Sequence, residues 1–244
     1  MKLINYCIER FKGKKSIPSN LLLTFLPSIY YFVTIRNSEK HNKEKYLPIM
    51  LCYLWGMFPG VILTLLLYLL LDILFLNRLL LNLSDNNKEI IMASIIAPIV
   101  EEIAKGSGLF FFTKKIDEEE DAHIYGAISG LGFATIENVL YSLNLTENNE
   151  ITFNPFIMII RYLTSTILHI YASSKFGEGV YTKNKKIYIM SILYHAFANF
   201  ILFTPTPLNF FVFVFLTIFY NILFKNLKKE ISNKDIKTKE NKKL

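Results

Sequence analysis

Residues 90–112 read IIMASIIAPIVEEIAKGSGLFFF, an apolar run interrupted by the adjacent glutamates Glu101 and Glu102 and then by Lys105. Charged side chains at membrane depth are costly, so a sequence that keeps them there has a functional reason. Residues three and four apart share one helix face, so Lys105 can reach either carboxylate. Such an ion pair lowers the cost of one charged glutamate and leaves the other available as a general base.

Similar apolar runs dominate the rest of the chain. Hydrophobic residues make up 52% of the 244 residues, and they are clustered in long runs that a soluble core would not need. A run of about 18 or more apolar residues can cross a bilayer as a helix. We therefore predict an all-α, polytopic membrane bundle of about seven transmembrane helices around a polar site. The predicted spans are residues 21–35, 47–76, 90–112, 122–143, 155–174, 187–203 and 208–224.

The charged segments lie mainly outside these spans. Residues 1–16 are predicted to be a basic amphipathic segment, 17–225 the transmembrane domain, and 226–244 a basic, disordered tail. Of the 27 Lys and Arg residues, 18 fall on the predicted side that carries the C-terminus and 7 on the other side. The positive-inside rule then predicts a cell-membrane protein with a cytoplasmic C-terminus, although the basic N-terminal segment disagrees. We expect the net charge of +7 to face anionic lipid, not nucleic acid.

Other predicted spans carry polar groups at similar depth: Glu137 and Asn138, His169, and His195 and Asn199. The pair Gly126 and Gly130 has small-xxx-small spacing, which lets a second helix approach closely. A lone histidine within a membrane is often only a packing residue. Two histidines beside three glutamates instead indicate a hydrolytic site, so we expect these side chains to converge between the helices.

Several hydrolytic chemistries can be compared with the sequence. It contains no His-Glu-x-x-His motif, and Asp72 is the only aspartate within a predicted span, so an aspartyl dyad has no second member. Ser129 lacks the leading glycine of a rhomboid-like nucleophile motif, which favours a packing role. Cys7 and Cys52 are too few for a thiolate metal site. What remains is water activated by a carboxylate, with or without a metal.

The order of these motifs resembles the PrsW family of intramembrane proteases. The motifs are Glu101-Glu102-x-x-Lys105, Phe133-x-x-x-Glu137-Asn138, His169, and His195-x-x-x-Asn199, and they fall on successive predicted spans. The related CAAX-prenyl protease and bacteriocin-processing group has an arginine after three residues in its first motif and a histidine at the end of its second. Lys105 and Glu137 follow the PrsW pattern at these two positions.

The resemblance implies a metalloprotease that cuts a single-span membrane protein such as an anti-sigma factor, on its extracytoplasmic side. It also implies roles for the site residues. Glu101 would activate water, Glu102 would pair with Lys105, and Asn199 would stabilise the oxyanion. Glu137, His169 and His195 would bind a divalent metal, with zinc as the first candidate, or orient the water without one. Lys105, which would only tune a carboxylate, is expected to matter less for activity than Glu101 or His195.

Two other classes of protein remain open on the sequence alone. An ion- or proton-coupled transporter also needs carboxylates and histidines within its spans, as a relay. A catalytically silent scaffold or immunity-type protein could keep the same residues to hold helices together. The transporter predicts no peptide cleavage, and the scaffold predicts that replacement of Glu101 by Gln leaves function intact.

Overall fold

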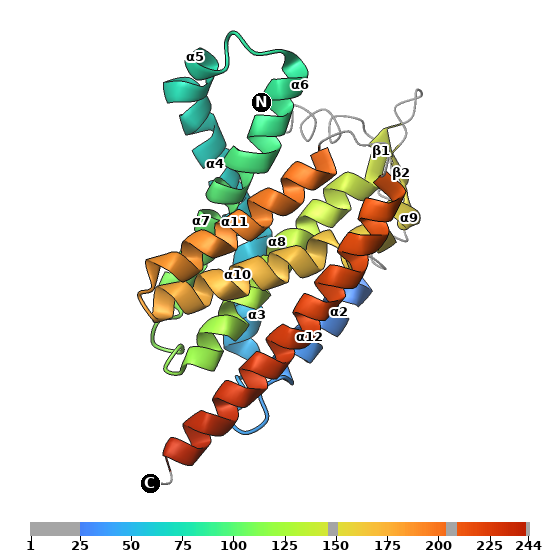
Figure 1. The fold of residues 1–244 in the computed structure, drawn as a ribbon. Coiled ribbons are helices and arrows are strands. Elements are labelled where there is room, and N and C mark those ends of the chain that lie inside the picture. Colours follow the sequence, from blue (N-terminus) through green and yellow to red (C-terminus); the bar gives the residue numbers. More distant parts are fainter. Residues whose placement is uncertain (1–24, 146–150, 204–208, 243–244) are drawn as a thin grey trace.

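The computed structural model describes residues 25–145, 151–203 and 209–242, which form a helical bundle with one short hairpin (Figure 1). The predicted amphipathic segment 1–16 lies outside these residues. The elements are α2 (Phe25–Arg36), α3 (Tyr46–Trp55), η2 (Gly56–Gly60), α4 (Val61–Leu71), η3 (Asp72–Leu76), α5 (Asn77–Leu79), α6 (Asp85–Ile91), η4 (Met92–Ile96), α7 (Ala97–Ser107), η5 (Gly108–Phe111), α8 (Glu119–Ser142), β1 (Leu143–Leu145), β2 (Ile151–Phe153), α9 (Pro155–Leu163), α10 (Ser165–Tyr181), α11 (Lys185–Phe203) and α12 (Asn209–Asn241).

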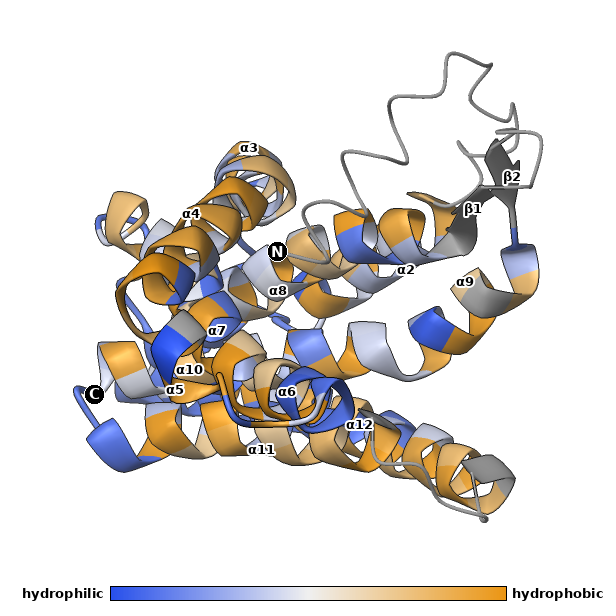
Figure 2. Cartoon of the chain, turned by 90° about the horizontal axis from the view of Figure 1, so that it is seen from above, coloured by the Kyte–Doolittle hydropathy of each residue, from blue (hydrophilic) through white to orange (hydrophobic). Residues whose placement is uncertain are grey.

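The helical character is as predicted, with one addition. β1 and β2 pair antiparallel, with Leu143 opposite Phe153, and join α8 to α9. Two helices of the described chain are long and apolar enough to cross a membrane by length and hydropathy, Tyr46–Leu76 and the stretch Phe211–Asn241 within α12. Hydrophobic residues also dominate the outward faces of α3, α4 and α11 (Figure 2).

Large apolar side chains lie on the outside of the bundle, while several charged ones, such as Glu102 and Lys105, are buried within it. The exposed ones include Leu66, Leu70, Phe197 and Phe215. A soluble monomer rarely shows contiguous apolar surface on this scale, so the outer face is suited to lipid.

Helix α8 lies at the centre of the bundle and packs closely against α10. A Cβ added at Gly126 would collide with the backbone of Ser173, and one added at Gly130 would meet the carbonyl of His169. The predicted small-xxx-small contact is therefore confirmed, and α10 is its partner. Because the two backbones approach so closely, Glu137 on α8 and His169 on α10 can make direct contact.

The long helices containing α3–α4 and α6–α7 each include five-residue π-helical segments. Pro59 lies within η2, and Pro98 follows η4 at the start of α7. Proline has no N–H, so it leaves carbonyls of the preceding turn without their helical donor. Near Pro98, the carbonyl of Ala93 accepts a hydrogen bond of 2.9 Å from the side chain of Asn199.

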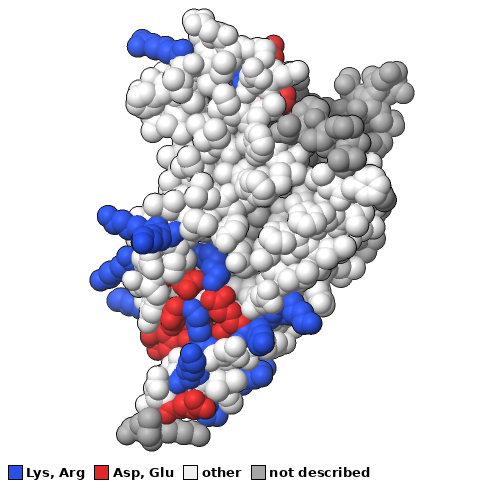
Figure 3. Space-filling view, viewed as in Figure 1, with Lys and Arg blue, Asp and Glu red and all other residues white. Residues whose placement is uncertain are grey.

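The basic tail is helical, and the prediction of disorder is wrong for residues 226–241. Helix α12 continues without a break to Asn241 because acidic groups at that end of the bundle give its lysines partners. Lys234 pairs with Glu119, and Asp235 accepts hydrogen bonds from the backbone N–H groups of Lys40 and His41. Figure 3 shows the acidic and basic side chains gathered toward the end of the molecule where α12 ends.

Candidate active site

Helix α7 contributes three charged side chains to the interior of the bundle. Glu101, Glu102 and Lys105 are all buried, and Glu102 and Lys105 have no exposed surface. The Lys105 ammonium lies 2.8 Å from Glu102 Oε1 and 3.4 Å from Glu101 Oε2. The lysine therefore reaches both carboxylates, with Glu102 as its closer partner, as the three- and four-residue spacing predicted.

Glu102 also orients His195, which α11 contributes from the opposite side. His195 Nδ1 lies 2.9 Å from Glu102 Oε1, and the hydroxyl of Ser173 donates to Glu102 Oε2 at 2.7 Å. A carboxylate that accepts from Nδ1 fixes the imidazole tautomer and leaves Nε2 as the nitrogen available to a ligand. His195 Nε2 faces Glu101 Oε2 at 3.8 Å.

A second chain of contacts holds His169, on α10. Its Nε2 lies 2.8 Å from Glu137 Oε2, and the Arg161 guanidinium lies 2.8 Å from the same oxygen. Nδ1 of His169 lies 2.8 Å from the Lys105 ammonium, and the two histidine rings meet edge to face with centroids 4.7 Å apart. The two chains are thus joined through Lys105 and through the histidine pair.

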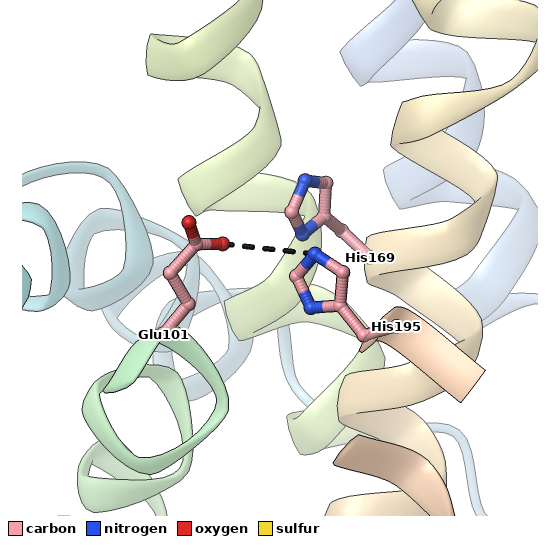
Figure 4. Close-up of side chains that lie close together, drawn as sticks. All are labelled: Glu101, His169 and His195. Atoms are coloured by element: carbon pink, nitrogen blue, oxygen red, sulfur yellow. Dashed lines mark ion pairs between the residues drawn. The ribbon is translucent and has the colours of Figure 1, made fainter. Parts of the chain in front are cut away.

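Glu101 differs from the other two carboxylates of the site. Its Oε2 is buried and receives no hydrogen bond from any described residue. Glu102 accepts from three side chains and Glu137 from two. Figure 4 shows the Glu101 carboxylate turned toward the histidine pair, with the contact to His195 dashed.

The donor set with metal-binding geometry is Glu101, His169 and His195. One ligand atom from each lies within 4.8 Å of the other two, and all three residues are buried. The sequence had assigned the carboxylate of this set to Glu137, which the structure instead pairs with Arg161 and His169. Two histidines and one glutamate form an accepted catalytic zinc set. The buried oxygen of Glu101 that lacks a donor, and Nε2 of His195, suit such a metal.

The structure brings together six of the predicted site residues: Glu101, Glu102, Lys105, Glu137, His169 and His195. Asn199 is the exception, because its amide nitrogen donates to the carbonyl of Ala93. That carbonyl lies five residues before Pro98, which has no N–H to offer it. In this structure Asn199 therefore ties α11 to η4, just before α7, instead of donating to the cluster.

Sequence reasoning missed two residues that the structure places in the site, Arg161 and Ser173. Arg161 also donates to Asn138 Oδ1 at 2.8 Å, and its guanidinium lies over the Tyr141 ring. A signal for it existed: Arg161 and Lys105 are the only arginine and lysine within the predicted spans. Ser173 carried no such signal, since serine is common at close helix contacts. Ser129 donates to the carbonyl of Lys105 and acts as a packing residue.

A bundle with an apolar exterior, and with carboxylates and histidines joined in its interior, defines a class of protein: a membrane-embedded hydrolase of the carboxylate–histidine type. Comparisons with known proteins identify the family. The model of the PrsW family of intramembrane metalloproteases matches residues 44–224, so the chain belongs to that family and is a protease. It is similar to Protease PrsW of Clostridioides difficile (strain 630), with 28% identity over 180 residues, which cover 70% of this chain and 72% of the relative. No solved structure matches the chain.

Proposed function

We propose that this protease hydrolyses a peptide bond of a single-span membrane protein, with Glu101 as the group that takes a proton from the attacking water. The observation that carries the proposal is the buried Glu101 Oε2, which receives no hydrogen bond from a described residue and lies 3.8 Å from His195 Nε2. A general base must have an oxygen available within hydrogen-bond reach of the water. Both oxygens of Glu102 accept from side chains, and Oε2 of Glu137 is held by His169 and Arg161.

The remaining site residues position these groups. Glu102 holds His195 by its Nδ1, and Lys105 and Ser173 in turn hold Glu102. Glu137 holds His169, and Arg161 holds Glu137. Each histidine is therefore oriented by a carboxylate that is itself fixed by a cation, which keeps the reacting groups in one geometry during turnover.

The donor types of the site fit a metal, and zinc is our first candidate. Glu101, His169 and His195 would hold it, and when bound it would supply a water that ionises near neutral pH and a Lewis acid for the peptide carbonyl. A carboxylate has two oxygens, so Glu101 can contact a metal through one and accept a proton through the other. Lys105, now 2.8 Å from His169 Nδ1, would keep its ion pair with Glu102 when His169 holds the metal.

Direct cleavage tests the base. The full-length protein, reconstituted in lipid with a tagged single-span reporter, should cleave it, and Glu101→Gln should abolish cleavage. Glu89→Gln is the matched control, because Glu89 lies on the same long helix but is exposed. A Glu101→Gln protein that cleaves the reporter at the wild-type rate would refute the assignment of Glu101 as the general base. Metal analysis of the purified protein, with cleavage assayed before and after chelation, separates the zinc-dependent route from the metal-free one.

We further propose that the bundle crosses the membrane about seven times, with the end of α12 in the cytoplasm and the substrate entering from outside. The connections 37–45 and 112–118 lie at the end of the bundle where α12 ends, and the β1–β2 hairpin lies toward the other end (Figure 1). The positive-inside count favours the cytoplasm for the first end. Such an orientation suits a first cut in an anti-sigma-factor-like substrate.

Cysteine labelling tests this orientation. A single cysteine beside Asn144 should react with an impermeant thiol reagent added to intact cells, and one beside Lys183 should react only after lysis. Labelling of the Lys183 position from outside would invert the proposed topology.

A further inference from the structure

A second cluster of buried carboxylates lies at the end of the bundle where α12 ends, and it contains none of the active-site residues. Glu39 follows α2, Glu118 directly precedes α8, and Asp121 lies in the first turn of α8. Glu39 and Asp121 have no exposed surface, and Glu118 is 7% exposed. One oxygen from each of the three lies within 4.8 Å of the other two. Like charges this close repel strongly unless a counter-charge lies among them.

Backbone groups fix the orientation of two of these carboxylates. The N–H of Glu44 donates to Glu39 Oε2 at 2.8 Å, and the N–H groups of Asp117 and Glu118 donate to Asp121 Oδ2 at 3.1 and 2.9 Å. The second oxygen of each, Glu39 Oε1 and Asp121 Oδ1, is buried and has no hydrogen-bond partner among the described residues. Carboxylates that ligate a metal have this arrangement, with one oxygen oriented by hydrogen bonds and the other left for the ion.

Among the described residues, two of the three carboxylates, Glu39 and Asp121, have no lysine partner, unlike the carboxylates of an adjacent buried group. In the adjacent group of Glu119, His123 and Glu178, Lys234 pairs with Glu119 and Lys175 lies 2.8 Å from Glu178. Within the described chain, Glu39 and Asp121 form no salt bridge. Glu118 pairs with Lys242, whose side chain is 63% exposed at the edge of the cluster. The buried oxygens of Glu39 and Asp121 therefore lack a cation.

We propose that Glu39, Glu118 and Asp121 bind a hard divalent cation, Mg²⁺ or Ca²⁺. All three side chains offer only oxygen, which these two ions prefer and which distinguishes this site from the histidine-containing active site. The ion joins the connection after α2 to the start of α8. Asp235 of α12 holds the backbone of Lys40, next to Glu39, and Lys242 holds Glu118. Cation binding thereby stabilises the docked end of α12.

Thermal unfolding of the full-length protein in detergent, after chelation and dialysis, tests the proposal. A ligand at 100 times its dissociation constant stabilises by about 2.7 kcal/mol, which for a chain of this size raises the midpoint by about 5 °C or more. We expect MgCl2 or CaCl2 to raise the unfolding midpoint by this amount more than KCl does at equal ionic strength. The salt that gives the larger rise identifies the preferred ion. Glu39→Gln should lose the rise, whereas the active-site variant Glu101→Gln should keep it.

Terbium luminescence gives a direct readout that does not depend on unfolding. Tyr125 lies one turn after Asp121 and donates to Glu44, so its ring can sensitise Tb³⁺ bound in the cluster. We expect Tb³⁺ emission that Ca²⁺ or Mg²⁺ displaces, and at least a 10-fold weaker displacement constant in Asp121→Asn. A wild-type protein with no divalent-specific stabilisation and no displaceable Tb³⁺ emission would overturn the proposal. If Glu39→Gln and Asp121→Asn responded to the divalent ions as strongly as the wild-type protein, the proposal would be overturned as well.

Discussion

Replacement of Lys105 by methionine should destabilise the protein strongly, because the lysine is the buried counter-ion of the site. Its ammonium lies 2.8 Å from both Glu102 Oε1 and His169 Nδ1, and neither Lys105 nor Glu102 has exposed surface. Methionine preserves the length and apolar stem but leaves Glu102 charged, with only His195 and Ser173 as donors. Removal of one partner of a buried ion pair costs about 3–5 kcal/mol. The midpoint of unfolding should therefore fall by roughly 6 to 20 °C.

A double variant separates this electrostatic effect from a packing defect. In Lys105→Met/Glu102→Gln the amide needs no counter-ion, its oxygen accepts from His195 and its NH2 donates to the Ser173 hydroxyl, so at least half of the lost stability should return. The measurements are unfolding midpoints of wild type, both single variants and the double variant in one detergent. Lys88→Met is the control, since Lys88 is partly exposed and its 3.8 Å pair with Asp85 contributes at most about 1 kcal/mol. A Lys105→Met protein as stable as wild type, or a double variant no better than the single one, would refute the reasoning.

Three further substitutions test the positioning contacts. Arg161→Gln should slow reporter cleavage about 10- to 100-fold while the protein stays folded, because partners that orient a ligating histidine have effects of that size; a rate equal to wild type would remove Arg161 from the site. Asn199→Ala should lower the free energy of unfolding by about 1–3 kcal/mol, since the Ala93 carbonyl loses its donor, and should cleave faster than Glu101→Gln; complete loss of cleavage in a stable protein would return Asn199 to the chemistry. Gly130→Ala should cost about 1–3 kcal/mol through collision with α10, and an unchanged unfolding midpoint would contradict the close packing.

The sequence predicted the parts of the fold that hydrophobicity and spacing control. Long apolar runs predicted helices, and the spacing of Gly126 and Gly130 predicted one close helix contact, which the structure assigns to α8 and α10. The helical tail was out of reach because its own composition is polar and basic. Its helix depends on contacts with residues more than 100 positions away, such as Lys234 with Glu119. No local pattern contains that information.

The same distinction between local and distant information applies to the site. Spacing of three and four residues placed Lys105 beside both glutamates, and the structure agrees. Which carboxylate joins the histidines depends on how α7, α8, α10 and α11 meet, so the sequence named Glu137 where the geometry offers Glu101. The role of Asn199 depends on Pro98 of another helix, because the free carbonyl that proline creates attracts the amide.

The formal charges of the site support the proposed role of Glu101 as the reactive carboxylate. Three glutamates, Glu101, Glu102 and Glu137, share two cations, Lys105 and Arg161, so one negative charge is in excess when both histidines are neutral. Lys105 lies closer to Glu102 than to Glu101, and Arg161 pairs with Glu137, which leaves the excess on Glu101. A buried excess charge is relieved by a proton taken from water or by a bound metal ion. Both outcomes serve hydrolysis, and both involve Glu101 Oε2, the buried carboxylate oxygen of the site that accepts no hydrogen bond from a described residue.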